Sequence, residues 1–278
     1  MTTAVLITGT SSGIGRATAE RLAARTDLTV YATARRLESI AALEKTGARL
    51  LELDVTDENS MTEAVRAVEA EHGSVGVLIN NAGYGEYGTI EETDLDGVRR
   101  QFETNVFGLA RLTQLALPAM RAAGHGRIVN VGSMGGRLVF PGGGYYHASK
   151  YAVEALTDAL RFEAAPFGIK VSLVEPGLIR TAFGDTAAHT LAASSRPSGA
   201  YAALNAAVDR QMAASYRSTL LSAPPQTVAA VIERAATSPR PRTRYVVTPA
   251  AKALVHARRL FGAKPFDAYL RLQFRSGS

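Results

Sequence analysis

The sequence predicts an α/β fold, a single doubly wound domain in which helices flank a parallel sheet of about seven strands. Short apolar runs of strand length alternate along the chain with segments of helical periodicity. The apolar runs are continuous, which is typical of parallel strands covered by helices on both faces. A sheet of that size uses nearly all 278 residues, so residues 1–278 are expected to form one domain.

The expected strands follow one another along the chain, and the segments between them are expected to be helices. The strands are predicted at residues 4–8, 28–34, 48–55, 75–80, 127–132, 169–175 and 244–247. Residues from about 182 to 224 interrupt this pattern, because they are rich in Ala, Thr, Ser and Gly up to residue 200 and lead into Pro224 and Pro225. This insertion between the sixth and seventh strands is expected to form a substrate loop.

The composition excludes several kinds of chemistry. The chain has no cysteine, and its five histidines show no ligand spacing, so no disulfide, no thiolate nucleophile and no metal site is expected. The apolar start Ala4–Ile7 is too short for a signal peptide, and no segment approaches the roughly 18 continuous apolar residues of a membrane-spanning helix. A cytoplasmic protein is expected.

The net charge of +6 is concentrated at the C-terminal end. Residues 240–278 hold nine Lys and Arg side chains against the single acid Asp267, a charge of +8, so the rest of the chain carries −2. Apolar residues alternate with these cations in a basic extension from about residue 248 to 278. The favoured interpretation is an amphipathic helix docked on the domain with its cations in solvent. Peripheral contact with an anionic membrane is the alternative, and nucleic acid is not an expected partner.

A glycine-rich turn follows the first expected strand and precedes a helical run, Arg16 to Arg25. Its three glycines would provide a tight turn, close approach of the backbone to a pyrophosphate, and close packing of the helix on the strand. This placement predicts a dinucleotide-binding site of the Rossmann type. The expected contact residues are Gly9, Ser11, Ser12, Gly13, Ile14 and Gly15.

The end of the second expected strand indicates which dinucleotide is bound. An acid at this place would accept a hydrogen bond from the ribose 2′-hydroxyl of NAD, but the chain has Arg35 and Arg36 and no acid. Guanidinium groups pair with a 2′-phosphate, and Ser12 offers a further hydroxyl donor. The sequence therefore predicts NADP(H), with Arg35 as the first choice for the phosphate contact. An exposed helix start at these two arginines is the structural alternative.

A serine, a tyrosine and a lysine predict proton-transfer chemistry. Ser133 precedes Tyr146 by 13 residues, and Lys150 follows Tyr146 by one helical turn. A phenol titrates near pH 10 unless a nearby positive charge stabilises its phenolate, and a lysine four residues on lies on the same helix face. A serine hydroxyl beside the phenol would orient a substrate oxygen. The spacing predicts a site that interconverts a carbonyl and an alcohol.

These motifs occur in a fixed order that resembles the short-chain dehydrogenase/reductase family. The resemblance covers residues 4 to about 181 and also includes Asp54-Val55, Asn80-Asn81-Ala82-Gly83, Asn105 and Pro176-Gly177. It implies that Tyr146 is the proton donor or acceptor, that Lys150 holds the nicotinamide ribose and lowers the Tyr146 pKa, that Ser133 binds the substrate oxygen, and that Asn105 positions a proton-relay water. It also implies cofactor contacts at Asp54, Val55, Asn81, Ala82, Gly83, Tyr146, Lys150, Pro176, Gly177, Ile179 and Thr181.

Two alternatives remain open beside this resemblance. Ser12 stands where a variant of the family glycine loop carries a basic residue, so NAD(H) is kept as the weaker cofactor alternative. The same fold can also bind NADP(H) as a non-catalytic regulator. A complete set of Ser133, Tyr146, Lys150 and Asn105 favours the enzyme, because a regulator has no need for it.

The substrate is expected to be a hydrophobic carbonyl compound or its alcohol. A looser resemblance to the 17β-hydroxysteroid and retinol dehydrogenase-like branch implies a steroid, a retinoid or a long-chain aldehyde. The apolar pocket is expected to include Leu138, Val139, Phe140, Tyr145, Leu178 and Phe183, with Met212 and Tyr216 as further candidates in the insertion; Tyr84 and Tyr87 are expected to be pocket wall. A homodimer or homotetramer is expected, paired through residues 94–123 and 147–165, where Ala148, Ala152, Ala155 and Ala159 would permit close packing.

Overall fold

The computed structural model describes residues 2–274. Seven strands form one sheet in the order β3-β2-β1-β4-β5-β6-β9, and all its neighbouring pairs are parallel. This confirms the prediction of a doubly wound sheet. The strands are β1 (Thr3–Ile7), β2 (Leu28–Ala34), β3 (Arg49–Glu52), β4 (Val77–Asn80), β5 (Gly126–Val131), β6 (Ile169–Glu175) and β9 (Arg244–Val246).

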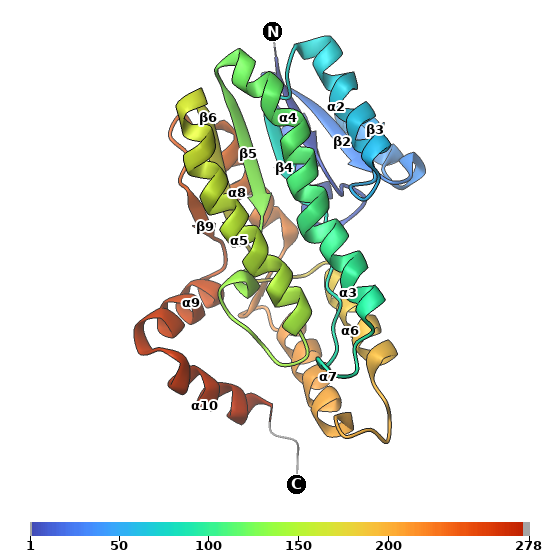
Figure 1. The fold of residues 1–278 in the computed structure, drawn as a ribbon, viewed down its shortest axis with the longest axis vertical. Helices are drawn as coiled ribbons and strands as arrows, with labels where there is room; N and C mark the ends of the chain where they lie inside the picture. Colours follow the sequence, from blue (N-terminus) through green and yellow to red (C-terminus); the bar gives the residue numbers. More distant parts are fainter. Residues whose placement is uncertain (1, 275–278) are drawn as a thin grey trace.

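Helices cover both faces of the sheet (Figure 1). Along β1, Val5 and Ile7 pack with α1 (Gly13–Ala23) and α8 (Pro225–Thr237). Leu6 points to the opposite face and packs with α2 (Glu58–His72) and α4 (Leu109–Ala123). Successive residues of one strand therefore enter two separate cores, which explains why the strands are apolar without alternation.

A long helical segment runs along the sheet from the carboxyl ends of the strands toward their amino ends (Figure 1). It consists of α3 (Leu95–Phe102), a π-helical stretch (Glu103–Gly108) and α4. Gly108 touches the loop after β3, because a Cβ there would lie 2.2 Å from the Val55 carbonyl oxygen. The next helix, α5 (Gly144–Ala164), runs beside α4 (Figure 1). Short 3₁₀ turns occur at Leu37–Ser39, Ala41–Thr46, Met134–Gly136 and Ala165–Phe167.

The segment between β6 and α8 is helical rather than an irregular loop. It contains α6 (Phe183–Ser194) and α7 (Ala202–Arg217), which pack on each other. A second, two-stranded parallel sheet of β7 (Leu178–Ile179) and β8 (Ser222–Ala223) closes the base of this segment. The sequence did not predict this small sheet, because two-residue strands leave no periodic signal.

After β9 the chain forms α9 (Pro249–Phe261) and α10 (Ala263–Gln273). Figure 1 shows both at the same end of the molecule as α6 and α7, beyond the carboxyl ends of the strands. No helix within residues 2–274 has the length and apolar character needed to cross a bilayer. Residues 275–278, including Arg275 of the basic extension, lie outside the described part of the chain.

Candidate active site

One cavity of about 1080 Å³ lies at the carboxyl edge of the sheet. The glycine-rich turn and the ends of β2, β3 and β4 line one part of it, and Ser133, Tyr146 and Lys150 line its middle. Side chains of α6, α7, α9 and α10 line the remainder. The cavity therefore joins the predicted dinucleotide site to the space beside the predicted catalytic residues.

The glycine-rich turn forms a cradle that side chains would fill. Gly9 and Gly13 have φ angles of 70° and 56°, in the left-handed region that favours glycine. A Cβ at Gly15 would lie 2.2 Å from the Gly9 carbonyl oxygen and 2.4 Å from Asn81 Nδ2. Helix α1 begins here, and the side chain of its N-cap residue, Ser12, makes no capping hydrogen bond. The turn and the uncapped helix end fit a dinucleotide pyrophosphate.

Thr8 and Asn81 fix the shape of this cradle. Asn81 Nδ2 donates hydrogen bonds to the carbonyl oxygens of Thr8 and Gly9, at 2.9 and 3.1 Å. The Thr8 hydroxyl oxygen accepts hydrogen bonds from the backbone N–H groups of Asn81 and Ala82, both at 2.9 Å. Asn81 thus joins the end of β4 to the turn after β1. Thr8, whose side chain is buried in this network, was not among the predicted site residues.

The predicted residues for the adenosine end divide into two groups. Arg35, Asp54 and Val55 line the cavity, whereas Arg36 does not and is exposed. Asp54 Oδ1 accepts hydrogen bonds from the Thr56 backbone and hydroxyl, at 2.9 and 2.7 Å, which orders the turn after β3. Arg36 is exposed, as Arg35 is, so its contact with the cofactor stays a prediction. Arg100, from α3, also lines this part of the cavity and was not predicted.

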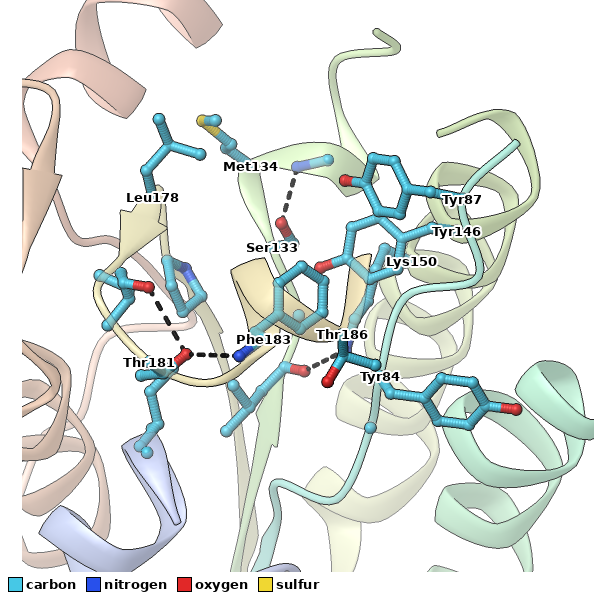
Figure 2. Close-up of a pocket in the computed structure, with 18 of the residues that line it drawn as sticks. Tyr84, Tyr87, Ser133, Met134, Tyr146, Lys150, Leu178, Thr181, Phe183 and Thr186 are labelled. Atoms are coloured by element: carbon cyan, nitrogen blue, oxygen red, sulfur yellow. Dashed lines mark hydrogen bonds between the residues drawn. The ribbon is translucent and has the colours of Figure 1, made fainter. Parts of the chain in front are cut away.

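Ser133, Tyr146 and Lys150 come together at the centre of the cavity (Figure 2). Ser133 follows β5, and its Oγ accepts a hydrogen bond of 3.0 Å from the Gly135 backbone N–H. Tyr146 and Lys150 lie one turn apart on the buried face of α5. Lys150 Nζ donates a hydrogen bond of 3.0 Å to the carbonyl oxygen of Val131, which ties α5 to the end of β5. Figure 2 shows the Tyr146 hydroxyl on the same side as Ser133.

Burial dominates the titration of these groups. It raises the pKa of Tyr146 to about 12, and the nearby Ser133 hydroxyl acts in the opposite direction. Burial lowers the pKa of Lys150 to about 8, because it disfavours the charged ammonium. Lys150 was expected to lower the pKa of Tyr146, but in the protein without a bound dinucleotide the pKa of Tyr146 is raised instead. The residues of the chain hold Tyr146 as a neutral phenol at neutral pH.

Aromatic rings enclose the phenol of Tyr146. The Tyr87 ring stacks on it with centroids 5.7 Å apart, and the Phe183 ring lies at 5.2 Å. Figure 2 shows both rings beside Tyr146, whereas the hydroxyl of Tyr84 points away from it. These neighbours keep water from the phenol and account for its high pKa.

Asn105 is a positioning residue in this structure. It lies in the π-helical stretch, is 1% exposed and does not line the cavity. Its Oδ1 accepts a hydrogen bond from the Tyr84 N–H at 3.0 Å, and its Nδ2 donates to the Tyr84 carbonyl oxygen at 2.8 Å and to Ser149 Oγ at 3.1 Å. Asn105 therefore holds the loop after β4 against α5, one residue from Lys150.

The remaining predicted cofactor residues lie together on one wall of the cavity. Pro176, Gly177, Ile179 and Thr181 all line the cavity, between the end of β6 and the start of α6. Thr181 packs against the glycine-rich turn, because a Cβ at Gly13 would lie 3.1 Å from Thr181 Cγ2. Asn81, Ala82 and Gly83 of the loop after β4 also line the cavity. The structure thus gathers residues from five separate stretches of the sequence around one space.

The residues predicted for the substrate pocket divide into those that line the cavity and those that do not. Phe140, Leu178 and Phe183 line the cavity, as do Met212 and Tyr216 of α7 and both Tyr84 and Tyr87. Leu138, Val139 and Tyr145 do not, and these three predictions are corrected. Leu138 packs in a core cluster with Val255 and Phe266, Val139 is exposed, and the Tyr145 hydroxyl donates to the Ile90 carbonyl oxygen at 3.2 Å.

Several lining residues were missed by the sequence analysis. They come from the turn after β5, from α5 to α7, and from the two C-terminal helices with the residue that follows them: Met134, His147, Thr186, Val208, Leu254, Tyr269 and Phe274. His147 is buried, its Nδ1 lies 3.0 Å from the Gly135 carbonyl oxygen, and burial lowers its pKa to about 4. Within residues 2–274, no group of three or more acidic or histidine side chains is arranged to hold a metal ion.

Comparisons with known proteins agree with this site. Residues 3–192 match the family model of the short chain dehydrogenases. The chain is 43% identical over 182 residues to a 3-ketodihydrosphingosine reductase of Bacteroides thetaiotaomicron, a match that spans 65% of either protein. It is 37% identical over 272 residues to the uncharacterized oxidoreductase YbbO of Escherichia coli K12, with 98% of this chain and 95% of that protein covered.

A solved structure shows the same fold with a cofactor bound. It is a short chain dehydrogenase/reductase from Burkholderia phymatum in complex with NAD, with a TM-score of 0.78 and 26% identity over 100% of this chain and 97% of that one. The fold, the glycine cradle and the family match agree with the resemblance read from the sequence. The chain belongs to the short-chain dehydrogenase family of oxidoreductases.

Proposed function

We propose that the chain is an NADP(H)-dependent oxidoreductase that interconverts a hydrophobic ketone or aldehyde and its alcohol. The observation that carries the proposal is the position of Tyr146. Its phenol lies beside Ser133, one helical turn from Lys150, in the cavity that also contains the glycine cradle. Proton transfer and dinucleotide binding would thus occur in one cavity.

Arg35 supports NADP(H) over NAD(H). It lines the cavity at the end of β2, where the strand order places the adenosine ribose, and no Asp or Glu follows β2 directly. A guanidinium there would pair with a 2′-phosphate. NAD(H) stays the weaker alternative, since the Burkholderia structure contains NAD.

The residues of the chain have distinct roles in carbonyl reduction. Ser133 Oγ already accepts a hydrogen bond from the Gly135 N–H, so its own hydrogen is available to bind the substrate oxygen. Tyr146, protonated at neutral pH, donates its proton to that oxygen. A bound nicotinamide would supply the hydride to the carbonyl carbon. Alcohol oxidation is the reverse, with Tyr146 accepting the proton.

Lys150 would hold the dinucleotide and act on Tyr146 through charge. One of its three ammonium hydrogens is used by the Val131 carbonyl oxygen, which leaves two for the hydroxyl groups of the nicotinamide ribose. Asn105 would keep the loop that carries Gly83 in place behind this contact. Its proposed part in a proton relay would use the remaining lone pair of Oδ1.

The cavity favours an apolar substrate. Met134, Leu178 and Phe183 surround the space near Tyr146, and Val208 and Leu254 continue it toward α7 and α9. Steroids, retinoids and long-chain aldehydes have the required apolar bulk beside a carbonyl group. The name of the Bacteroides relative adds 3-ketodihydrosphingosine as a candidate.

The test is a measurement of NADPH and NADH oxidation with a ketosteroid, retinal, medium-chain aldehydes and 3-ketodihydrosphingosine. The proposal expects turnover of at least one class, with a higher kcat/KM for NADPH than for NADH. Turnover with NADH alone would contradict the role of Arg35. Binding of NADPH without turnover of any class would favour the alternative of a non-catalytic regulator.

A homodimer or homotetramer formed through α4 and α5 completes the proposal. Ala148, Ala155 and Ala159 are exposed along α5, beside the exposed rings of Tyr151 and Phe162. Small residues between exposed apolar side chains suit close packing of two copies of one helix.

A further inference from the structure

The two C-terminal helices form a hairpin with an unusual outer surface. We propose that this hairpin, α9 and α10 joined at Gly262, is a docking surface for an anionic phospholipid bilayer. The proposal does not depend on which carbonyl compound the enzyme reduces. It rests on the apolar side chains, the charges and the position of the hairpin.

The inner side of the hairpin is attached to the domain. Val255 of α9 and Phe266 of α10 are buried and pack on Leu138, in a cluster separate from the two main cores. The Arg258 guanidinium lies over the Phe266 ring, 5.9 Å from its centroid. The hairpin is therefore a fixed part of the fold, and its outer side chains are presented on a stable framework.

Three large apolar side chains of the hairpin are exposed to solvent. Leu260 is 77% exposed, Phe261 is 65% exposed and Leu272 is 63% exposed. Leu260 and Phe261 lie at the turn between the helices, and Leu272 lies near the end of α10. Exposed leucine and phenylalanine side chains at the turn and near the end of one helical hairpin indicate a surface that meets an apolar partner.

Unpaired cations accompany these apolar residues. The hairpin carries five basic side chains and one acid, Asp267: the bases are Lys252, Arg258, Arg259, Lys264 and Arg271. Within the described residues, no carboxylate lies within 4.0 Å of any of the five. By contrast, Arg244, just before the hairpin, forms ion pairs with Glu154 and Asp158. The free cations give the hairpin a local positive charge.

The combination of the two features identifies the partner. A nucleic acid would neutralise the cations but would leave Leu260, Phe261 and Leu272 in water. A second copy of the hairpin would cover the apolar residues but would bring two positive surfaces together. An anionic bilayer would bind the cations and also cover the apolar side chains, because basic side chains reach the headgroups while leucine and phenylalanine enter the interface. No helix of residues 2–274 is able to span a membrane, so the attachment is interfacial.

The position of the hairpin connects the bilayer with the active site. Leu254 of α9 and Tyr269 of α10 line the cavity, so the inner side of the hairpin is one of its walls. Gln211 of α7 donates a hydrogen bond of 2.9 Å to Gln273, which fixes α10 against the insertion. A hairpin on the bilayer would hold this end of the cavity next to a source of apolar compounds.

The test is sedimentation of the full-length protein with phosphatidylcholine vesicles, with and without phosphatidylserine, at low and high salt. The proposal expects binding only to the phosphatidylserine vesicles, and weaker binding at high salt. Each basic residue near such a surface strengthens partitioning by about fivefold, so Arg259→Glu with Lys264→Glu lowers the partition coefficient at least about 25-fold. Leu260→Ser with Phe261→Ser weakens binding at both salt concentrations.

The matched control is Arg66→Glu with Arg196→Glu, which reverses the charge of two exposed cations on α2 and on the α6–α7 connection. It changes the net charge by the same amount, and binding close to that of the wild type is expected. NADPH affinity and the unfolding temperature show that each variant is folded. Absence of binding to phosphatidylserine vesicles at low salt, equal loss in the control, or a hairpin variant that only changes the oligomeric mass in light scattering would overturn the proposal.

Discussion

Deprotonation of Lys150 provides a quantitative test of its role in holding the dinucleotide. Burial lowers the pKa of this ammonium to about 8. If only the charged form binds the ribose, the NADPH dissociation constant scales with the factor 1 + 10^(pH − pKa). Between about pH 7.5 and about pH 9.5 this factor rises roughly 25-fold. Affinity is therefore retained below the pKa of Lys150 and lost above it.

The neighbouring groups leave this pH window clear. Burial raises the pKa of Tyr146 to about 12 and lowers that of His147 to about 4, so neither changes charge within it. Glu154, one turn after Lys150, has its pKa raised to about 7 by burial, so about three quarters of it is already ionised where the window begins. The slope of affinity against pH therefore reports on Lys150.

The assay is a fluorescence titration of NADPH at several pH values with the wild type and with Lys150→Met. The variant has a chain of similar length and no charge. It is expected to bind weakly at all these pH values, with no slope between about pH 7.5 and about pH 9.5. A wild-type dissociation constant that stays constant across this window, or a slope that persists in Lys150→Met, would refute the assignment of the ribose contact to Lys150.

Three further predictions address the cofactor, the interior and the assembly. Arg35→Ser is expected to weaken NADPH binding about 10- to 100-fold, because a charge-assisted contact is lost, and to leave the affinity for NADH unchanged. Arg36→Ser is expected to have little effect on either affinity. Equal effects of the two variants in an NADPH titration would contradict this prediction. Glu154 lies beside Glu175, Asp158, Arg137 and Arg244, and burial raises its pKa from the usual 4.5 to about 7. Between these two pH values the folded state holds a proton that the unfolded state releases. The free energy of unfolding therefore falls as the pH rises from about 4.5 to about 7. Urea unfolding at about pH 5 and about pH 8 is expected to show a smaller difference for Glu154→Gln, and an unchanged difference would contradict the assignment. Ala155→Arg is expected to lower the oligomeric mass in light scattering, and an unchanged mass would exclude the α5 interface.

The sequence predicted the parallel sheet and the position of the glycine-rich turn, and the physical reason is local. Each strand is buried on both faces, as Val5 and Leu6 show, so its apolar run is visible without any knowledge of its neighbours. The glycines after β1 are required by backbone geometry, since Gly9 and Gly13 have positive φ. Features that depend only on residues close together in the chain can therefore be predicted from the local sequence.

The substrate side of the cavity depends on which way individual side chains point and on contacts between segments far apart in the chain. Local sequence patterns contain neither kind of information. Tyr145 and Tyr146 are adjacent, but successive residues of a helix point about 100° apart, so one reaches Ile90 and the other lies beside Ser133. Leu254 and Tyr269 follow Tyr146 by more than a hundred residues and reach the cavity only because α9 and α10 fold back over it. No periodicity in the C-terminal segment indicates that contact.

The most direct test of the proposed role of Tyr146 is the rate of hydride transfer in a single turnover. It is measured with NADPH and with whichever of the carbonyl compounds named above the enzyme reduces. Tyr146→Phe is expected to bind NADPH with unchanged affinity and to transfer hydride about 10²- to 10⁴-fold more slowly, because it cannot donate the proton. Tyr84→Phe, in which the lost hydroxyl points away from Tyr146, is expected to keep the wild-type rate. A Tyr146→Phe rate close to that of the wild type would contradict the central claim that this phenol is the proton donor.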